Sequence, residues 1–175
     1  VLGSGSWSTI TVTATEENLT NKAARINVYG TSKKDWYLSP MIDLTEADTA
    51  QHIGMTMMVA LSHYSKHTQV VAGEQADDIF AVLISEDGGA TWTEGNVTRW
   101  DNSGAADYAY DAIPVACQKY TILMDKYIGK TVQIALYAES TVDGGDNYLY
   151  VDDIVLDYVD FNCMGIQNLQ IVPGT

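Results

Sequence analysis

Two adjacent carboxylates, Asp152 and Asp153, interrupt a strand-like stretch near the end of the chain. The apolar residues that would face a core change phase at this pair: Leu149 and Val151 precede it, and Ile154 and Leu156 follow it. Because side chains alternate along a strand, the change of phase predicts a β-bulge that turns one carboxylate toward the sheet edge. Few lysines or arginines lie nearby, and calcium takes about six to eight oxygen ligands, so a calcium ion suits this position.

Other acidic residues could supply further ligands to such an ion. Asp35, Asp43, Asp78 and Glu17 each stand at the expected start of a strand, where sheet edges could converge. The alternative is that these carboxylates cap turns and face solvent on an acidic surface. The ligand spacing of an EF-hand loop is absent. The sequence therefore predicts a structural calcium held by the adjacent pair, with Asp35, Asp43 and Asp78 as candidate partners.

The segment from Trp100 to Asp111 is the best candidate for binding a ligand. It interleaves the rings of Trp100, Tyr108 and Tyr110 with amide and carboxylate acceptors. Sugar rings stack their C–H faces on aromatic rings, while their hydroxyl groups need polar partners of this kind. The alternative is a long loop whose tyrosines only cover a sheet and bind no ligand. His63 and His67 lie in a second long loop. Their spacing suits zinc only in a helix, and the flanking residues indicate strand, which argues against a zinc site.

Catalytic patterns are weak in this chain. A retaining glycosidase needs two carboxylates about 5–5.5 Å apart, and no suitable strand pattern occurs. Glu86 and Asp87 are adjacent in an expected turn, and no serine lies in a nucleophile elbow. Asp87 belongs instead to a Ser-x-Asp-x-Gly-x-Thr-Trp pattern that ends at Trp92 and is typical of a local hairpin. Sialidase propellers repeat this hairpin, whereas the chain has one copy, so a propeller is excluded.

The elements that must position these residues are strands. Apolar residues recur with a period of two through most of the chain, and Gly, Asn and Asp clusters separate the runs. The expected strands are Thr9–Ala14, Arg25–Tyr29, Ile53–Leu61, Ile79–Ser85, Lys119–Asp125, Thr131–Ser140 and Leu149–Tyr158. The run from Ile79 to Ser85 is apolar on both faces, as in a central strand covered on both sides. The pattern predicts an all-β fold, a two-sheet antiparallel β-sandwich with jelly-roll topology.

Composition agrees with this fold and limits the function. The chain has 175 residues with 9 Lys+Arg and 23 Asp+Glu, a net charge of −14. Such a charge repels phosphate backbones and anionic lipids, which argues against nucleic acid and membrane surfaces as partners. No apolar run approaches the roughly 20 residues of a spanning helix. Cys117 and Cys163 are too few for a disulfide scaffold, and whether they pair is left open.

Several segments in order resemble one domain family. They are Asp35–Pro40 with Ile42–Leu44, Asp78–Gly89, Thr91–Trp92, Tyr127–Ala135 and Tyr148–Ile154. This succession, over residues 31–159, resembles the cleaved-adhesin or choice-of-anchor jelly-roll domain of bacterial surface proteins, which is itself similar to the MAM domain. The resemblance implies a secreted or surface-attached, non-catalytic module, often with calcium. In similar domains the first aspartate of the Asp-Asp pair binds a structural calcium, and the resemblance assigns this role to Asp152.

These observations predict a binding module with a structural calcium, whose partner is a glycan or a host-surface protein. The domain is expected to span residues 1–160. Residues 161–175 would add an edge strand or begin a following domain of a longer chain. Two other functions remain open: a glycan-processing or peptidase-associated catalytic domain, and a spacer between neighbouring domains.

Overall fold

The computed structural model describes residues 6–11, 22–92 and 98–160 of the chain. These residues form mainly strands, with short turns of 3-10 helix at η2 (Tyr110–Ala112) and η3 (Asp125–Tyr127). The strands are β1 (Ser8–Thr11), β2 (Lys22–Val28), β3 (Lys33–Asp43), β4 (His52–His63), β5 (Ile79–Ser85), β6 (Thr98–Trp100), β7 (Gln118–Leu123), β8 (Thr131–Ser140) and β9 (Asn147–Val159). The predicted all-β class is therefore confirmed.

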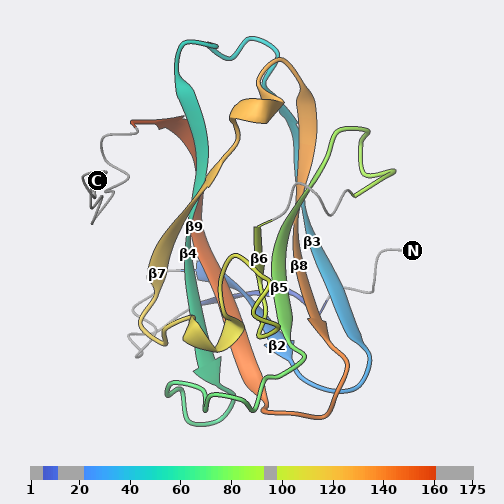
Figure 1. Cartoon of the computed structure of the whole chain (residues 1–175), viewed down its shortest axis with the longest axis vertical. Coiled ribbons are helices and arrows are strands. Elements are labelled where there is room, and N and C mark those ends of the chain that lie inside the picture. Colours follow the sequence, from blue (N-terminus) through green and yellow to red (C-terminus); the bar gives the residue numbers. More distant parts are fainter. Residues whose placement is uncertain (1–5, 12–21, 93–97, 161–175) are drawn as a thin grey trace, which may run out of the picture.

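The described strands form two antiparallel sheets that pack face to face (Figure 1). One sheet has the order β1-β2-β9-β4-β7, and the other has the order β3-β8-β5-β6. Strands far apart in sequence are therefore neighbours, because the chain crosses repeatedly from one layer to the other. This arrangement of two Greek keys is the predicted jelly-roll sandwich.

The core lies between the sheets and consists of alternate residues of the long strands. On β8 the side chains of Val132, Ile134, Leu136 and Ala138 are buried, as the period of two predicts. Phe80 on the neighbouring β5 also points inward and is fully buried. Burying an aliphatic or aromatic side chain contributes about 1.5–3 kcal/mol, so this layer is the main source of stability.

The strands expected from the period of two did not include β3, which forms one edge of the four-stranded sheet. Its residues Trp36, Tyr37 and Leu38 are consecutive and apolar, so no alternation is visible there. The pairing of β3 with β8 also slips between Leu38 and Met41, which breaks the period again. A strand that carries large side chains on both faces and a bulge has no clear period of two.

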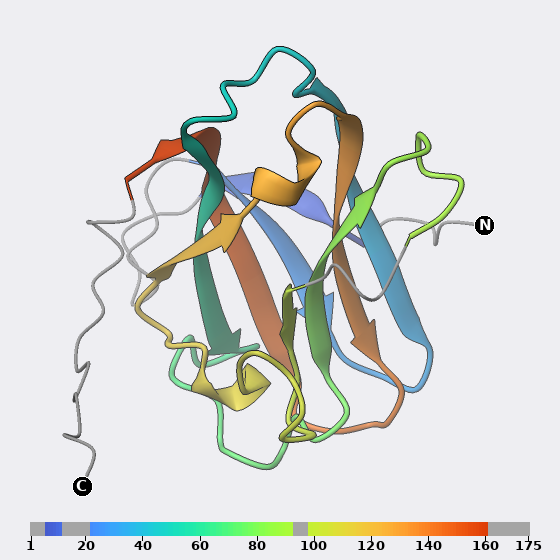
Figure 2. The ribbon, with the colours of Figure 1, turned by 45° about the horizontal axis from the view of Figure 1, so that its top comes forward.

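Three loops meet at one end of the sandwich, at the bottom of Figure 2. They are residues 64–78, 101–113 and 141–146. Hydrogen bonds join them: the N–H of Gly73 donates to Asp111 over 2.6 Å, and the N–H of Gly145 donates to the carbonyl of Glu74 over 2.7 Å. The N–H of Val142 donates to the carboxylate of Asp77 over 2.6 Å. Carboxylates at this end therefore serve mainly to hold loops together.

Some sequence predictions fall outside the described residues. Residues 161–175, with Cys163, are among them, so the domain boundary at residue 160 stays a prediction and the question of a Cys117–Cys163 pair stays open. In the described part of the chain, no helix has the length and apolar character needed to cross a membrane.

Candidate functional site

Asp152 and Asp153 occupy a bulge in β9, as predicted. Asp153 has a φ of 48°, which is uncommon for a residue other than glycine. The pairing of β9 with β4 slips at this point, between Thr56 and Met58. The N–H of Asp153 donates to the carboxylate of Asp152 over 2.8 Å. Partial burial raises the pKa of Asp152, and the neighbouring charge of Asp153 adds to the effect.

Asp35 and Asp43 lie on β3, in the opposite sheet, and each already has local partners. Asp35 is buried, accepts a hydrogen bond from the N–H of Ser6 over 3.2 Å and lies 3.6 Å from the ammonium group of Lys33. Asp43 accepts the N–H and the hydroxyl of Thr45 over 2.9 and 2.6 Å. These hydrogen bonds lower the pKa of Asp43, that from the hydroxyl most.

Asp78 precedes β5 and is buried at the loop end of the sandwich. Its carboxylate accepts a hydrogen bond from the side-chain amide of Asn147 over 2.7 Å. The hydroxyl of Tyr110 donates to the same amide group over 2.9 Å. Burial raises the pKa of Asp78 to about 6, although hydrogen bonds from Ser140 and Asn147 oppose the shift. Asp78 therefore belongs to a buried polar network.

The described residues do not bring Asp35, Asp43 and Asp78 together with Asp152 as one set of ligands. Eight residues of strand, about 26 Å, separate Asp35 from Asp43, and Asp152 lies in the other sheet. Within residues 6–11, 22–92 and 98–160, no three His, Cys, Asp or Glu side chains are grouped to hold a metal ion. Glu17 lies outside them, and calcium at Asp152 and Asp153 stays a prediction.

The loop from Trp100 to Tyr110 also differs from its prediction. Trp100 and Tyr110 are fully buried, so neither ring offers a face to a ligand. Trp100 packs on Phe80 in the core, with ring centroids 4.9 Å apart. Of the three rings, only that of Tyr108 is exposed, at 42%. One face of this ring stacks on Trp100, with ring centroids 5.0 Å apart. These rings mainly anchor the loop, because an apolar ring next to a core gains more by burial than by exposure.

The two histidines of the loop after β4, and Asp87 of the hairpin after β5, make contacts with nearby residues. His63 accepts the N–H of Ser65 on its ring over 3.2 Å, and His67 stacks on Tyr148 at 6.4 Å. Asp87 accepts the N–H and the hydroxyl of Thr91 over 2.8 and 2.6 Å, and these bonds lower its pKa to about 2. The prediction that Asp87 orders a hairpin is therefore confirmed.

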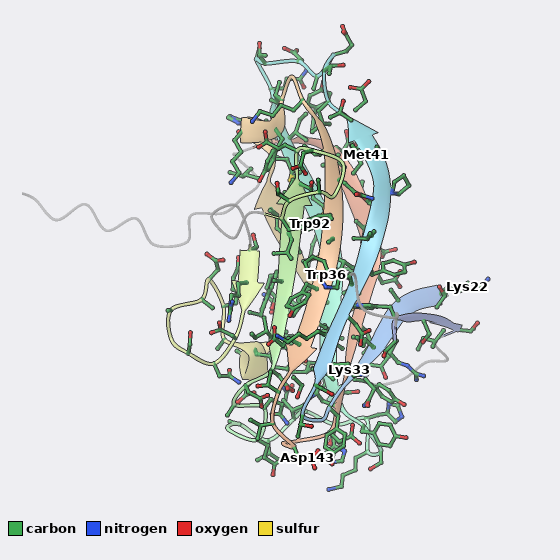
Figure 3. All side chains as sticks on the ribbon, turned by 90° about the vertical axis from the view of Figure 1, so that its right-hand side faces the viewer. Lys22, Lys33, Trp36, Met41, Trp92 and Asp143 are labelled. Atoms are coloured by element: carbon green, nitrogen blue, oxygen red, sulfur yellow. The ribbon has the colours of Figure 1, made fainter. Side chains whose placement is uncertain are left out.

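A set of partly buried rings that the sequence analysis missed lies on the outer face of the four-stranded sheet. The strand register places Trp36 of β3, Tyr137 of β8, Ala81 of β5 and Arg99 of β6 in one row across the sheet. Trp92 follows β5 and lies near this row. Figure 3 views the face directly and shows Trp36 and Trp92 close to its centre.

The rings form one connected cluster. The ring centroid of Trp36 lies 4.8 Å from that of Tyr137 and 5.5 Å from that of Trp92, and the three side chains are only partly buried. Beneath them the sheet presents the small residues Ala81 and Ala135, which are buried. The rings therefore cover these small residues and form the outermost apolar layer of the face.

Charged pairs border the cluster. Lys34 lies 3.1 Å from the carboxylate of Glu139, which also accepts the hydroxyl of Tyr137. At the β6 end of the row, Arg99 pairs with Asp101. Burial, followed by the hydrogen bond to Glu139, raises the pKa of Tyr137 well above its usual value. The face thus combines apolar rings with donors and acceptors, and it carries both signs of charge.

One sequence signal pointed to this face. The run from Ile79 to Ser85 is apolar on both sides, which indicated that the outer side of β5 is covered. The cover consists of Trp36, Trp92 and Tyr137, which come from three separate segments. The alternation within one strand cannot show which segments meet, so the rings were not assigned to one site.

Comparisons with known proteins support the fold. No protein-family model matches the chain, and no curated protein matches it in sequence. Among solved structures, the K1 cleaved adhesin domain of Lys-gingipain from Porphyromonas gingivalis is similar, with a TM-score of 0.52 and 15% identity. The match covers 89% of this chain and 92% of that domain. The carbohydrate-binding module TmCBM61, solved with β-1,4-galactotriose, gives a TM-score of 0.49 and 9% identity over 88% of this chain and 83% of its own.

The likeness to the gingipain domain confirms the cleaved-adhesin type of sandwich that the sequence resemblance implied. At this identity it shows the fold alone. The function must therefore be argued from the side chains of this chain.

Proposed function

We propose that this domain is a non-catalytic module that binds a glycan on the aromatic face formed by Trp36, Trp92 and Tyr137. The observation that carries the proposal is the connected ring cluster on the outside of a rigid sheet, with centroid distances of 4.8 and 5.5 Å. Apolar rings of this size normally face a core, and here they lie partly open on an outer surface.

The chemistry of the face suits a pyranose ring. A sugar has one face of C–H groups, which packs on an aromatic ring, and a rim of hydroxyl groups, which needs hydrogen bonds. Trp36 and Tyr137 offer the stacking surface. Glu139, on β8 two residues after Tyr137, supplies a carboxylate acceptor, and Arg99, at the β6 end of the row, supplies guanidinium donors.

The charges favour a neutral glycan. Lys34 pairs with Glu139 and Arg99 pairs with Asp101, so the cationic groups on this face already have anionic partners. A neutral sugar can hydrogen-bond to these pairs without breaking them, whereas an acidic sugar would compete with a carboxylate and meet a protein with a net charge of −14. Such a module would act outside the cell, secreted or at the surface, beside neighbouring domains.

A glycan array probed with the full chain tests this function. The expected result is selective binding to neutral oligosaccharides, followed by a loss of affinity of about tenfold or more in Trp36→Ala, because central aromatic residues dominate binding energy. Tyr64→Ala is the matched control, since Tyr64 is an exposed tyrosine, at 43%, beside the other sheet.

Circular dichroism of both variants would show that they fold. An array without any hit would contradict the proposal and favour a spacer. Equal loss in Trp36→Ala and Tyr64→Ala would contradict the assignment to this face.

A further inference from the structure

In the part of the chain that the structure describes, the five-stranded sheet has a free edge beside the second half of β9. β2 pairs with β9 only as far as Val151, whereas β9 pairs with β4 on its other side up to Val159. None of the described strands pairs with β9 on the β2 side beyond Val151. At Tyr158 the N–H already donates to the carboxylate of Asp157, over 2.7 Å, so a further strand that pairs at this residue must displace that side chain. This edge therefore offers backbone donors and acceptors to a further strand.

A groove runs beside this edge, between β9 and β3. Its first part has a volume of about 310 Å³ and is lined almost entirely by apolar side chains of both sheets, among them Met55, Ile134 and Ile154. The second part, of about 420 Å³, shares Ile42 and Leu156 with the first. Figure 3 shows β3 at the edge of its sheet on this side of the molecule.

The groove leaves apolar surface open to solvent. Ile154 is 46% exposed and Tyr37 is 42% exposed, although both line the first part. An aliphatic side chain next to an existing apolar cavity gains about 25 cal/mol for each Å² that a ligand covers. The surface and the free strand edge run along the same strand, so one extended ligand could use both.

The second part of the groove is acidic. Asp43, Glu46 and Asp157 line it, and its lining contains no Lys, Arg or His. Hydrogen bonds from Thr45 lower the pKa of Asp43, so this group is ionised at neutral pH. An occupant with a positive charge at that end would complement these carboxylates.

We propose that this groove binds an extended strand of a partner protein, with alternating apolar side chains and a lysine or arginine at one end. The strand would extend the sheet at β9, place its apolar side chains in the first part of the groove, and direct its basic end to the second. Residues 161–175 of this chain contain no Lys or Arg. The acidic part therefore favours a partner over the chain's own final segment.

A synthetic peptide tests the proposal on the full chain. The probe has about eight residues, alternates valine and threonine, and ends in a lysine pair. We expect it to bind at least about tenfold more tightly than the same peptide with glutamates, and the double variant Glu46→Gln with Asp157→Asn should reduce that ratio. The lysine peptide with alternate backbone nitrogens methylated should not bind, because it cannot donate to the β9 edge. Equal binding of all three peptides, or of none, would overturn the proposal.

Hydrogen exchange of the free chain separates the other possible occupants. The amides of residues 154–158 that point away from β4 should exchange rapidly in the free protein and become protected when the lysine peptide binds. Protection without peptide at every protein concentration would show that the chain fills its own groove. Protection that grows with protein concentration would show that a second copy fills it. Either result would overturn the proposal of a separate partner.

Discussion

The buried carboxyl group of Asp78 should make the stability of this domain depend on pH. Its pKa is about 6 in the folded protein and 3.8 without the protein environment. The difference of about 2.2 units corresponds to roughly 3 kcal/mol at 1.36 kcal/mol per unit. Burial is the cause, since the side chain is nearly inaccessible and its hydrogen bonds from Asn147 and Ser140 do not compensate fully.

The sign follows from the raised pKa. The folded state holds this proton more tightly than the unfolded state, so the contribution of the neutral group is fully present below about pH 4. It is lost as the pH rises toward and through 6, and the ionised carboxylate then destabilises the fold. Between pH 4 and pH 8 the expected loss from Asp78 is about 2–3 kcal/mol.

Urea unfolding of the wild-type chain and of Asp78→Asn between pH 4 and pH 8 measures this loss. The amide does not titrate, so the wild type should lose about 2–3 kcal/mol relative to the variant over this range. Asp77→Asn is the matched control next in sequence. Hydrogen bonds from Thr141 and Val142 lower the pKa of Asp77 despite its burial, so the wild type should gain stability relative to that variant as the pH rises. A difference between wild type and Asp78→Asn that stays constant with pH would refute the reasoning.

Two further predictions concern residues that the sequence singled out. Trp100→Ala should destabilise the fold by about 3–5 kcal/mol in urea unfolding, because Trp100 is fully buried. At low temperature, where part of this variant remains folded, the folded protein should bind glycan as tightly as the wild type. An affinity loss as large as that of Trp36→Ala would return the binding site to the loop. Calcium at a hundred times its Kd should raise the melting temperature by roughly 5–11 °C relative to chelator, and Asp152→Ala should abolish the shift. An unchanged melting temperature in the wild type would exclude a structural calcium.

The sequence by itself determined the layer structure and the local turns. The period of two along β4 and β8 follows directly from alternation, because a buried face selects apolar residues at every second position. The bulge at Asp152 and Asp153 was visible for the same reason, as a change of phase within one strand. The hairpin around Asp87 depends on hydrogen bonds within a few residues, so its pattern can be recognised in a short stretch of sequence.

Only the tertiary structure decided which side chains share a surface. Trp36, Tyr137 and Arg99 lie on β3, β8 and β6, which the jelly-roll crossings bring into one row. Trp100 has the same residue type as Trp36, yet it points into the core because its position on β6 faces the other sheet. The candidate calcium partners Asp35 and Asp43 are not brought together, because they lie eight residues apart on one strand. Exposure and proximity depend on long-range pairing, whereas the sequence pattern of one strand reports only its own alternation.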